Sequence, residues 1–234
     1  MKKNLIKASI SCATIALATS PGFAQDSDVS VSVSIDYVTE YVFRGVSFED
    51  EAIQPGIELG FGDFTIGTWA SAGLGSDSLA DTDEIDFYAG YSWALSDVVS
   101  ASVGATWYHF PDGTDTYEGY VGLGFDTAFA PSLTAYYDVE LEALTLEGGI
   151  GHSIPTGDKT SFDLGLVGGL VTVDGPGDYE WATASAAYSY AINDVGSVYA
   201  GINVSLNSED VLNFSAATPD DSLIWAGFGV SAGF

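Results

Sequence analysis

From residue 29 the chain reads Val29-Ser30-Val31-Ser32-Val33-Ser34-Ile35-Asp36-Tyr37, with apolar and polar residues in strict alternation. Successive side chains of a β-strand point to opposite faces, so this run would present an apolar face and a polar face. The same period of two recurs in residues 133–140, 198–207 and 224–234. No segment combines a 3.6-residue period with a helix cap. The sequence therefore predicts an all-β protein.

Runs of this kind, separated by turn residues, predict twelve strands. We expect them at residues 28–46, 55–62, 64–74, 84–94, 98–110, 116–126, 132–140, 144–154, 160–173, 179–191, 196–207 and 222–234. The links after even-numbered strands are mostly compact, whereas three links after odd-numbered strands are longer and acidic: residues 48–54, 75–83 and 208–221. Short turns on one side and long loops on the other are typical of antiparallel transmembrane β-barrels of the bacterial outer membrane. Residues 25–234 would form one such domain.

Aromatic residues on the apolar face are expected at the two ends of the strands, where the interfaces of a bilayer would lie. At the expected periplasmic end they are Phe61, Phe64, Tyr91, Trp93, Phe125, Phe162, Tyr188, Tyr190 and Phe234. Towards the outer end they are Tyr41, Phe43, Trp107, Tyr117 and Tyr137. The alternative is a soluble β-sandwich, whose strands also alternate. A sandwich gives no reason for two aromatic bands.

The N-terminus has the layout of a cleavable secretion signal, which we expect to span residues 1–24. Lys2, Lys3 and Lys7 precede an apolar stretch, and Gly22-Phe23-Ala24 supplies small residues for cleavage. Cys12 permits a lipoprotein reading as the alternative. Cleavage would leave Arg44 and Lys159 against 33 acidic residues, a formal charge of −31, and no cysteine for a disulfide. Nucleic acid, which requires basic residues to neutralise its phosphates, is excluded as a partner.

Carboxylates recur at positions that we assign to the inward, polar face of the strands. They are Asp36, Glu40, Glu58, Asp86, Glu118, Asp138, Glu140, Glu147, Asp163 and Glu180. A lumen lined by acidic side chains would favour cations over anions. The alternative is that such barrels are polar inside in any case, without selectivity. The acidic run Phe48–Glu51 could bind Ca²⁺ or bridge to lipopolysaccharide through divalent ions, or it is a solvated charge run without the spacing of an EF-hand.

Arg44 is the only arginine of the chain and is expected on the same inward face as Asp36 and Glu40. A guanidinium group among carboxylates should be held by bidentate pairing. We expect Glu58, on the neighbouring strand, to be the partner. Such a pair would fix the strand register, or it would take part in transport.

Two histidines are candidates for the catalytic base of an outer-membrane lipid enzyme. His109 and His152 lie near opposite ends of their strands and on the apolar face, and neither has a recognisable Ser or Asp partner in the sequence. No phosphate-binding glycine-rich loop and no Cys/His cluster is present. We therefore expect no catalysis, no cofactor and no metal site.

One segment resembles a known family. Tyr41-Val42-Phe43-Arg44-Gly45-Val46-Ser47 resembles the signature of the TorF family of outer-membrane porins, and weaker similarities follow in residues 53–56, 66–71 and 84–91. The resemblance covers roughly residues 29–94. It implies an outer-membrane barrel with pore activity and assigns no substrate. After Ser47 the chain departs from the family, since the acidic Phe48–Glu51 replaces a more neutral loop.

These observations predict a porin of the bacterial outer membrane that passes small polar or cationic solutes through an acidic lumen. The alternative is a closed barrel that serves as a structural or surface-binding protein, because twelve strands lie between filled and open barrels in width. The expected partners are outer-membrane lipid, lipopolysaccharide and the solutes. The barrel-assembly machinery is expected to recognise the C-terminal Phe234.

Overall fold

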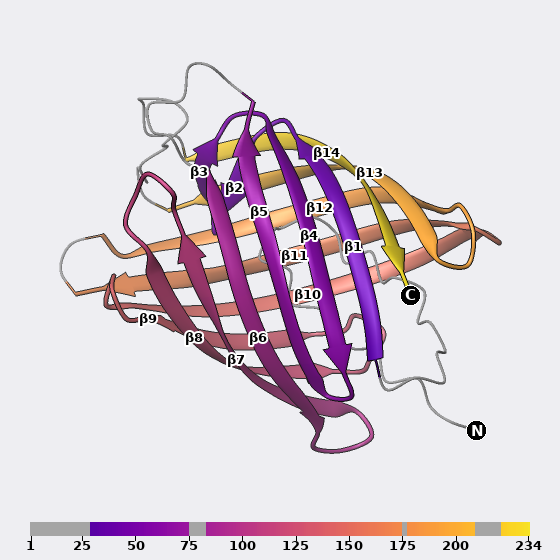
Figure 1. Ribbon diagram of the computed structural model, residues 1–234, viewed down its shortest axis with the longest axis horizontal. Coiled ribbons are helices and arrows are strands. Elements are labelled where there is room, and N and C mark those ends of the chain that lie inside the picture. The colour runs from indigo at the N-terminus through magenta and orange to yellow at the C-terminus, as the bar shows by residue number, and fades with distance from the viewer. Residues whose placement is uncertain (1–28, 75–82, 175–176, 209–220) are drawn as a thin grey trace.

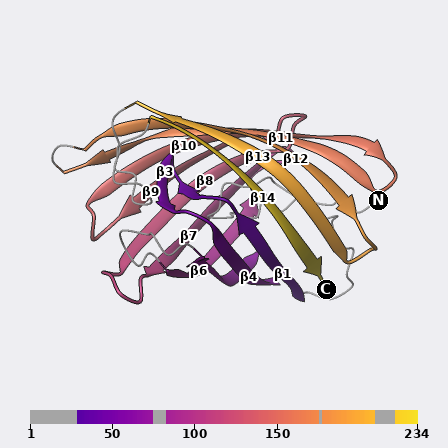
Figure 2. The ribbon, with the colours of Figure 1, turned by 90° about the horizontal axis from the view of Figure 1, so that it is seen from above.

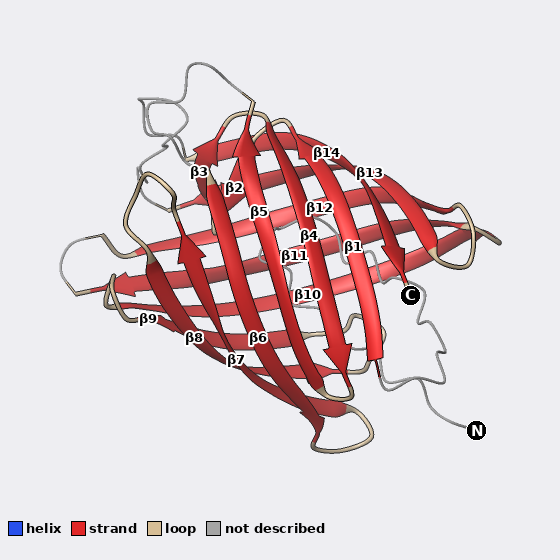
Figure 3. Ribbon diagram, in the orientation of Figure 1, coloured by secondary structure: helices blue, strands red, loops and turns tan. Residues whose placement is uncertain are grey.

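The computed structural model describes residues 29–74, 83–174, 177–208 and 221–234. The expected signal at residues 1–24 and most of two expected long loops, at 75–82 and 209–220, lie outside the described residues. The described residues form β-strands joined by turns and loops (Figure 3). In this part of the chain no helix has the length and apolar character needed to cross a membrane.

Twelve strands form a closed antiparallel barrel, in the order β1-β14-β13-β12-β11-β10-β9-β8-β7-β6-β5-β4, with β4 paired back to β1 (Figure 1). Their bounds are β1 Val29–Val38, β4 Ala52–Phe61, β5 Phe64–Gly73, β6 Glu84–Ala94, β7 Val99–His109, β8 Thr116–Phe125, β9 Ser132–Asp138, β10 Ala143–Gly157, β11 Thr160–Val173, β12 Tyr179–Ala191, β13 Gly196–Asn207 and β14 Ser222–Gly233. The predicted barrel of twelve strands is confirmed.

The start of β1 and the end of β14 lie at the same end of the barrel. Each of the five turns at this end has only two to six residues. Because outer-membrane barrels keep their short turns in the periplasm, this end is called the periplasmic end below and the opposite one the outer end.

The outer surface of the barrel is apolar. Large hydrophobic side chains with more than a third of their surface exposed occur on all twelve barrel strands, and they include Val33, Ile66, Val121, Leu166 and Ile202. A soluble protein rarely exposes so continuous an apolar surface, whereas lipid covers it in a membrane barrel. The chain is therefore a barrel of the bacterial outer membrane.

Most aromatic residues assigned to the apolar face are confirmed there. The exposed ones are Phe61, Phe64, Tyr91, Trp93, Phe162, Tyr188, Tyr190 and Phe234 at the periplasmic end, with Trp107, Tyr117 and Tyr137 towards the outer end. Tyr41 contradicts the expectation, because only 4% of its surface is exposed and it lies inside the barrel. Phe43 likewise packs against the buried cluster that contains Tyr41.

The first predicted strand, at residues 28–46, is confirmed only over Val29–Val38. Strand β1 ends at Val38, and β4 begins at Ala52, directly opposite Val38 in the ladder. The thirteen residues between them contain β2 (Tyr41–Phe43) and β3 (Val46–Glu49), which pair only with each other as a separate two-stranded sheet. We call residues 39–51 the inner hairpin. Figure 2 shows it inside the barrel, between the wall formed by β1 and β4 and the opposite wall. The expected acidic outer loop at residues 48–54 therefore comprises the end of β3, a bend at Asp50 and Glu51, and the start of β4.

The lumen has two levels. At the level of the inner hairpin, every strand of the barrel contributes a buried inward side chain: Val38, Gln54, Ser71, Asp86, Tyr108, Glu118, Asp138, Thr145, Val171, Trp181, Asn203 and Trp225. Towards the periplasmic end the inward positions carry small residues that water reaches, including Ser32, Ser34, Ser102, Ser185 and Ser231. The hairpin therefore fills the outer part of the lumen, whereas small and mostly partly exposed inward side chains line the periplasmic part.

Candidate functional site

The tip of the inner hairpin is built by two residues with left-handed backbone conformations, Arg44 with φ of 49° and Gly45 with φ of 78°. Gly45 fits against the wall because it has no side chain. A Cβ atom at Gly45 would lie 2.7 Å from the Cβ atom of Trp181 on β12. Asn207 Nδ2 on β13 donates a hydrogen bond to the carbonyl oxygen of Gly45 at 3.0 Å. The tip thus contacts the wall at β13 and β12, the second and third strands from β1 in the barrel order.

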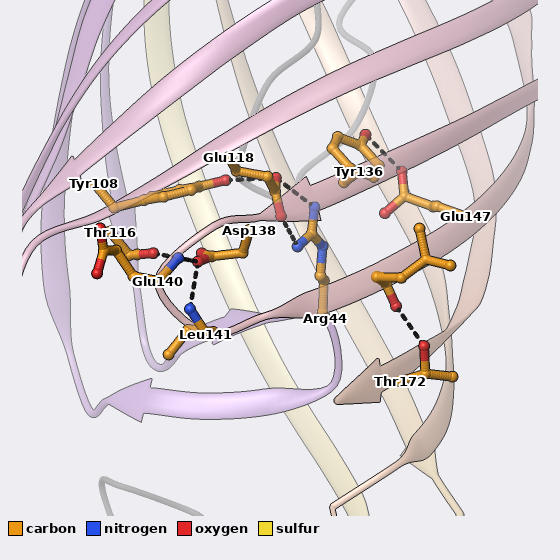
Figure 4. Close-up of polar contacts among 11 residues, drawn as sticks. Arg44, Tyr108, Thr116, Glu118, Tyr136, Asp138, Glu140, Leu141, Glu147 and Thr172 are labelled. Atoms are coloured by element: carbon orange, nitrogen blue, oxygen red, sulfur yellow. Dashed lines mark hydrogen bonds and ion pairs between the residues drawn. The ribbon is translucent and has the colours of Figure 1, made fainter. Parts of the chain in front are cut away.

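Arg44 points from this tip towards strands β7 to β10 (Figure 4). Its Nη1 and Nη2 atoms donate to Glu118 Oε2 and Oε1 at 2.6 and 2.9 Å. The side chains of Arg44 and Glu118 are only 11% and 5% exposed. The guanidinium carbon also lies 4.4 Å from the ring centre of Tyr136, a cation–π contact. Bidentate pairing and stacking together fix both the position and the plane of this group.

Two further hydrogen bonds hold the partners of Arg44. Tyr108 Oη donates to Glu118 Oε1 at 3.0 Å, and Tyr136 Oη donates to Glu147 Oε1 at 3.3 Å. We call Tyr108, Glu118, Tyr136 and Glu147 the guanidinium site. These four side chains come from β7, β8, β9 and β10, so four consecutive strands of the wall supply the site.

The stem of the hairpin packs on other parts of the wall. Tyr41 Oη donates to Glu84 Oε2 on β6 at 2.8 Å, and the Tyr41 ring lies 5.5 Å from that of Trp69 on β5. On the opposite side of the hairpin, Val42 forms a buried cluster with Leu223 and Trp225 of β14. The hairpin thus contacts the wall on several sides, through apolar packing as well as through hydrogen bonds.

The expectation that Glu58 pairs with Arg44 is corrected. The bidentate partner of Arg44 is Glu118, while Tyr88 Oη donates to Glu58 Oε2 at 3.2 Å. The prediction failed because it treated Arg44 as part of a straight wall strand, where the neighbouring strand is within reach. From the tip of a hairpin, Arg44 reaches strands that are far from β1 around the barrel.

Two of the expected inward carboxylates lie outside the lumen. Glu180 is exposed and has the same parity as the exposed Tyr188, whereas its neighbour Trp181 is buried inside. Glu140 is exposed in the turn after β9. The expected solvated run Phe48–Glu51 is also wrong at Glu49, which is 3% exposed and lies against Gly73. Glu40 is partly exposed in the bend between β1 and β2.

The remaining expected carboxylates lie inside the barrel, and several accept hydrogen bonds from the wall. Asp36 accepts from Tyr199 Oη at 2.7 Å. Asp163 accepts from the hydroxyls of Ser153, Ser161 and Ser189 at 2.5, 3.1 and 2.7 Å. Asp86 is 1% exposed. The structure brings Arg44, Glu118 and Glu147 into one site and distributes the others around the wall.

Asp138 has a local structural contact. Its Oδ1 atom accepts from the backbone amides of Glu140 and Leu141 at 3.0 and 2.8 Å, and from Thr116 Oγ1 at 2.5 Å. It therefore caps the turn between β9 and β10 and ties that turn to β8.

Sequence reasoning missed Tyr108 and Tyr136 of the guanidinium site, and it missed Glu84, which accepts the hydrogen bond from Tyr41 in the stem of the hairpin. Glu84 has the parity of Asp86 and could have been found from it. The two tyrosines gave no signal, because their role depends on where the hairpin tip lies.

His109 has an acidic partner that the sequence did not reveal. Its Nδ1 atom lies 2.9 Å from Asp115 Oδ1, and Trp107 Nε1 donates to Asp115 Oδ2 at 2.9 Å. The hydrogen bond from His109, followed by that from Trp107, lowers the pKa of Asp115 below its ordinary value. His152 Nδ1 lies 2.7 Å from the carbonyl oxygen of Ala128, at the other end of the barrel. Among the described residues, no group of three or more His, Cys, Asp or Glu side chains is arranged to hold a metal ion.

Comparison with known proteins gives one family and a set of similar folds. The profile of a family described as a bacterial protein of unknown function, Gcw_chp, matches residues 23–139. Comparison of the sequence with curated proteins gave no significant match.

Among solved structures, the NanC porin is similar with a TM-score of 0.61 at 12% identity, covering 86% of this chain and 98% of NanC. The KdgM porin is similar with a TM-score of 0.59 at 14% identity, covering 87% and 99% of the two chains. An outer-membrane channel from Pseudomonas putida F1 has a TM-score of 0.53 at 11% identity, covering 88% and 95%. At such low identities these similarities concern the fold.

Proposed function

The chain belongs to the Gcw_chp family of bacterial proteins of unknown function, and we propose that it is an outer-membrane porin for small polar or cationic solutes whose passage is controlled by the inner hairpin. Its fold is shared with the NanC and KdgM porins. The sequence resemblance to the TorF family of porins, which centres on the hairpin residues 41–47, supports the same function.

The observation that carries the proposal is the charge inside the barrel. Asp36, Glu58, Glu118, Glu147 and Asp163 are inward side chains, and within the described residues the two basic side chains are Arg44, in the lumen, and Lys159, in the turn after β10. Carboxylates in a narrow space of low dielectric attract cations and repel anions. A net negative lumen is therefore expected to prefer cations.

The sign of this charge predicts which solutes the barrel should exclude. One KdgM structure was determined in complex with disordered oligogalacturonate, a chain of acidic sugars. An acidic lumen would repel such a solute. We therefore expect this protein to exclude acidic oligosaccharides although the barrel is similar.

The twelve buried inward side chains at the level of the hairpin, here called the buried ring, imply that permeation requires the hairpin to move. We propose that the described conformation is the closed one, held by the contacts of Arg44 and Tyr41. Opening would separate Arg44 from Glu118 and withdraw the tip from Trp181.

The test is conductance in planar bilayers with and without the hairpin. Val38 and Ala52 are already paired, so residues 39–51 can be replaced by Asn-Gly, which favours a two-residue β-turn. We expect low or intermittent conductance from the full chain and a larger, steady, cation-selective conductance from the variant. Reversal potentials in a KCl gradient measure the selectivity, and a preference for chloride would contradict the proposal.

The buried ring also favours a second function, a permanently closed barrel with a structural or surface-binding role. Liposome swelling with sugars of graded size distinguishes the two. If the full chain passes no sugar in the swelling assay and no current at any voltage, and only the variant without residues 39–51 conducts, the protein is a closed barrel with a structural or surface-binding role.

Three further expectations concern export and the membrane. We propose that residues 1–24 are removed on export, that Phe234 is recognised during barrel assembly, and that outer-membrane lipid and lipopolysaccharide surround the barrel. Mass spectrometry of the protein purified from outer membranes tests the first, since the mature chain should begin at Gln25. Outer-membrane yield of a Phe234→Ala variant tests the second.

A further inference from the structure

We propose that the guanidinium site is the binding site for a solute that carries a guanidinium group, and that Arg44 occupies this site as a tethered competitor. The inference rests on the proposed function, since it names the class of solute that the barrel would admit. It goes beyond that function in assigning a specific site and a chemical group.

The site belongs to the wall and not to the hairpin. Tyr108, Glu118, Tyr136 and Glu147 lie on β7 to β10. From the hairpin come the guanidinium group and the ring of Phe43, which lies 4.6 Å from the guanidinium carbon and 6.2 Å from the ring of Tyr108. Strand pairing between these four strands does not involve residues 39–51. A barrel whose hairpin has moved would therefore keep all four side chains on adjacent strands.

The geometry of the site selects a planar cation. Both oxygens of Glu118 accept from the two Nη atoms, at 2.6 and 2.9 Å, which requires the forked arrangement of a guanidinium group. The ring of Tyr136 lies 4.4 Å from the guanidinium carbon and so provides a flat surface for stacking. A primary ammonium is a compact point charge that can use neither the fork nor the full ring face.

The neighbours of Glu118 fix its position. Tyr108 Oη donates to Glu118 Oε1 at 3.0 Å, so one carboxylate oxygen is held by the wall independently of Arg44. Glu147 is held in the same way by Tyr136 at 3.3 Å. Preorganised acceptors lose little freedom on binding, and this raises affinity for a ligand that matches them.

The charge of the site also favours a second cation. The site contributes two carboxylates, Glu118 and Glu147, against the single charge of Arg44 (Figure 4). When Arg44 leaves, both carboxyl groups lie in a largely buried part of the lumen without its positive charge beside them. An incoming cation would then compensate them, so solute binding and hairpin displacement are coupled events.

The tether makes the competition unequal. A side chain linked to the wall through a short segment has an effective concentration on the order of millimolar. A free solute must exceed this to displace Arg44 from the native protein. Removing the Arg44 side chain should therefore reveal the site.

The experiment measures binding of butylguanidinium and butylammonium to the purified full chain in detergent by isothermal titration calorimetry. The native protein is compared with Arg44→Ala, with the double variant Arg44→Ala/Glu118→Gln, and with Lys159→Ala as a matched loss of a basic side chain outside the site. Circular dichroism and heat-dependent gel mobility verify that each barrel is folded.

We expect Arg44→Ala to bind one butylguanidinium at least about tenfold more tightly than the native protein does. Arg44→Ala should also bind butylguanidinium at least about tenfold more tightly than it binds butylammonium. The double variant should lose this binding, and Lys159→Ala should behave as the native protein does. Absence of binding to folded Arg44→Ala, or equal affinity for the two cations, overturns the inference. If Arg44→Ala does not fold, the variant with Asn-Gly in place of residues 39–51 is titrated instead, because it also lacks the Arg44 side chain. The same two outcomes would overturn the inference.

Calorimetry does not depend on conduction, so the two proposals can fail separately. Binding without conductance in any variant would refute the porin function and leave the site. Conductance with no guanidinium binding would leave the porin function and refute the site.

Discussion

At the scale of single residues, the Arg44–Glu118 pair ties the tip of the hairpin to the wall. Breaking a buried ion pair from one side leaves an uncompensated charge, which costs about 3 to 5 kcal/mol. We expect Arg44→Met to destabilise the barrel by about this amount, and Glu118→Gln to cost less because glutamine can still accept one hydrogen bond. Urea titration of the protein in lipid vesicles, followed by tryptophan fluorescence, measures both.

The double variant Arg44→Met/Glu118→Gln completes the cycle. If the two side chains interact, its destabilisation is smaller than the sum of the two single values. Lys159→Met is the control, because Lys159 is exposed and its Nζ donates to the carbonyl oxygen of Ile192 at 3.0 Å. A strictly additive cycle would contradict the pairing.

Gly45 offers a second residue-scale prediction, with Gly62 as its matched control. Both have positive φ, 78° and 62°, so alanine at either position costs about 1 kcal/mol or more of backbone strain. A Cβ atom at Gly45 would meet Trp181 at 2.7 Å, whereas nothing lies within 4 Å of one at Gly62. Overpacking adds about 1 to 3 kcal/mol at Gly45 alone.

We therefore expect Gly45→Ala to be the less stable variant and to conduct more often in bilayers, because the tip can no longer lie against β12. Gly62→Ala should conduct as the native protein does. Equal conductance in the two variants would mean that the packing of the hairpin tip against β12 does not control the passage of ions.

At the scale of the elements, the strand period predicted the barrel but concealed the hairpin. Tyr41, Phe43 and Arg44-Gly45 continue the alternating pattern of β1, so the sequence favoured one long strand. The pattern cannot distinguish a wall strand from a strand inside the lumen. The structure shows the difference in Tyr41 and Val42, consecutive residues that are both 4% exposed, because a strand inside the barrel is covered on both faces.

The partners of Arg44 were beyond sequence reasoning for the same reason. Its importance followed from being a single arginine among carboxylates. Glu118 is separated from it by 74 positions and could be identified only once the turn at Gly45 had placed the tip. By contrast, parity alone was enough to place Asp36, Glu58 and Asp163 inside the barrel.

The turn between β9 and β10 yields a prediction about Asp138. Its Oδ1 atom accepts two backbone hydrogen bonds in that turn, a contact that an asparagine oxygen can reproduce. We expect Asp138→Ala to destabilise the barrel by about 1 to 2 kcal/mol and Asp138→Asn to restore most of it, comparable to the loss of other capping side chains. If Asn and Ala variants are equally unstable, the charge of Asp138 matters more than the cap.

At the scale of the whole molecule, the charge of the lumen should determine which ions pass, and salt should screen it. The Debye length falls from about 10 Å at 0.1 M to about 3 Å at 1 M, so the preference for potassium over chloride should decline as KCl is raised. Glu58 is the informative side chain, because it faces the partly wetted lumen on β4. Glu180 is its control, because it is exposed on the outside of β12.

In the background that lacks residues 39–51, where permeation is expected to be greatest, Glu58→Gln should lower the ratio of potassium to chloride permeability at 0.1 M KCl. Glu180→Gln removes the same charge from the same barrel but not from the lumen, so it should leave the ratio unchanged. Reversal potentials at both salt concentrations give the ratio directly. If both substitutions reduce selectivity alike, the preference arises from the net charge of the protein and not from the side chains that line the passage.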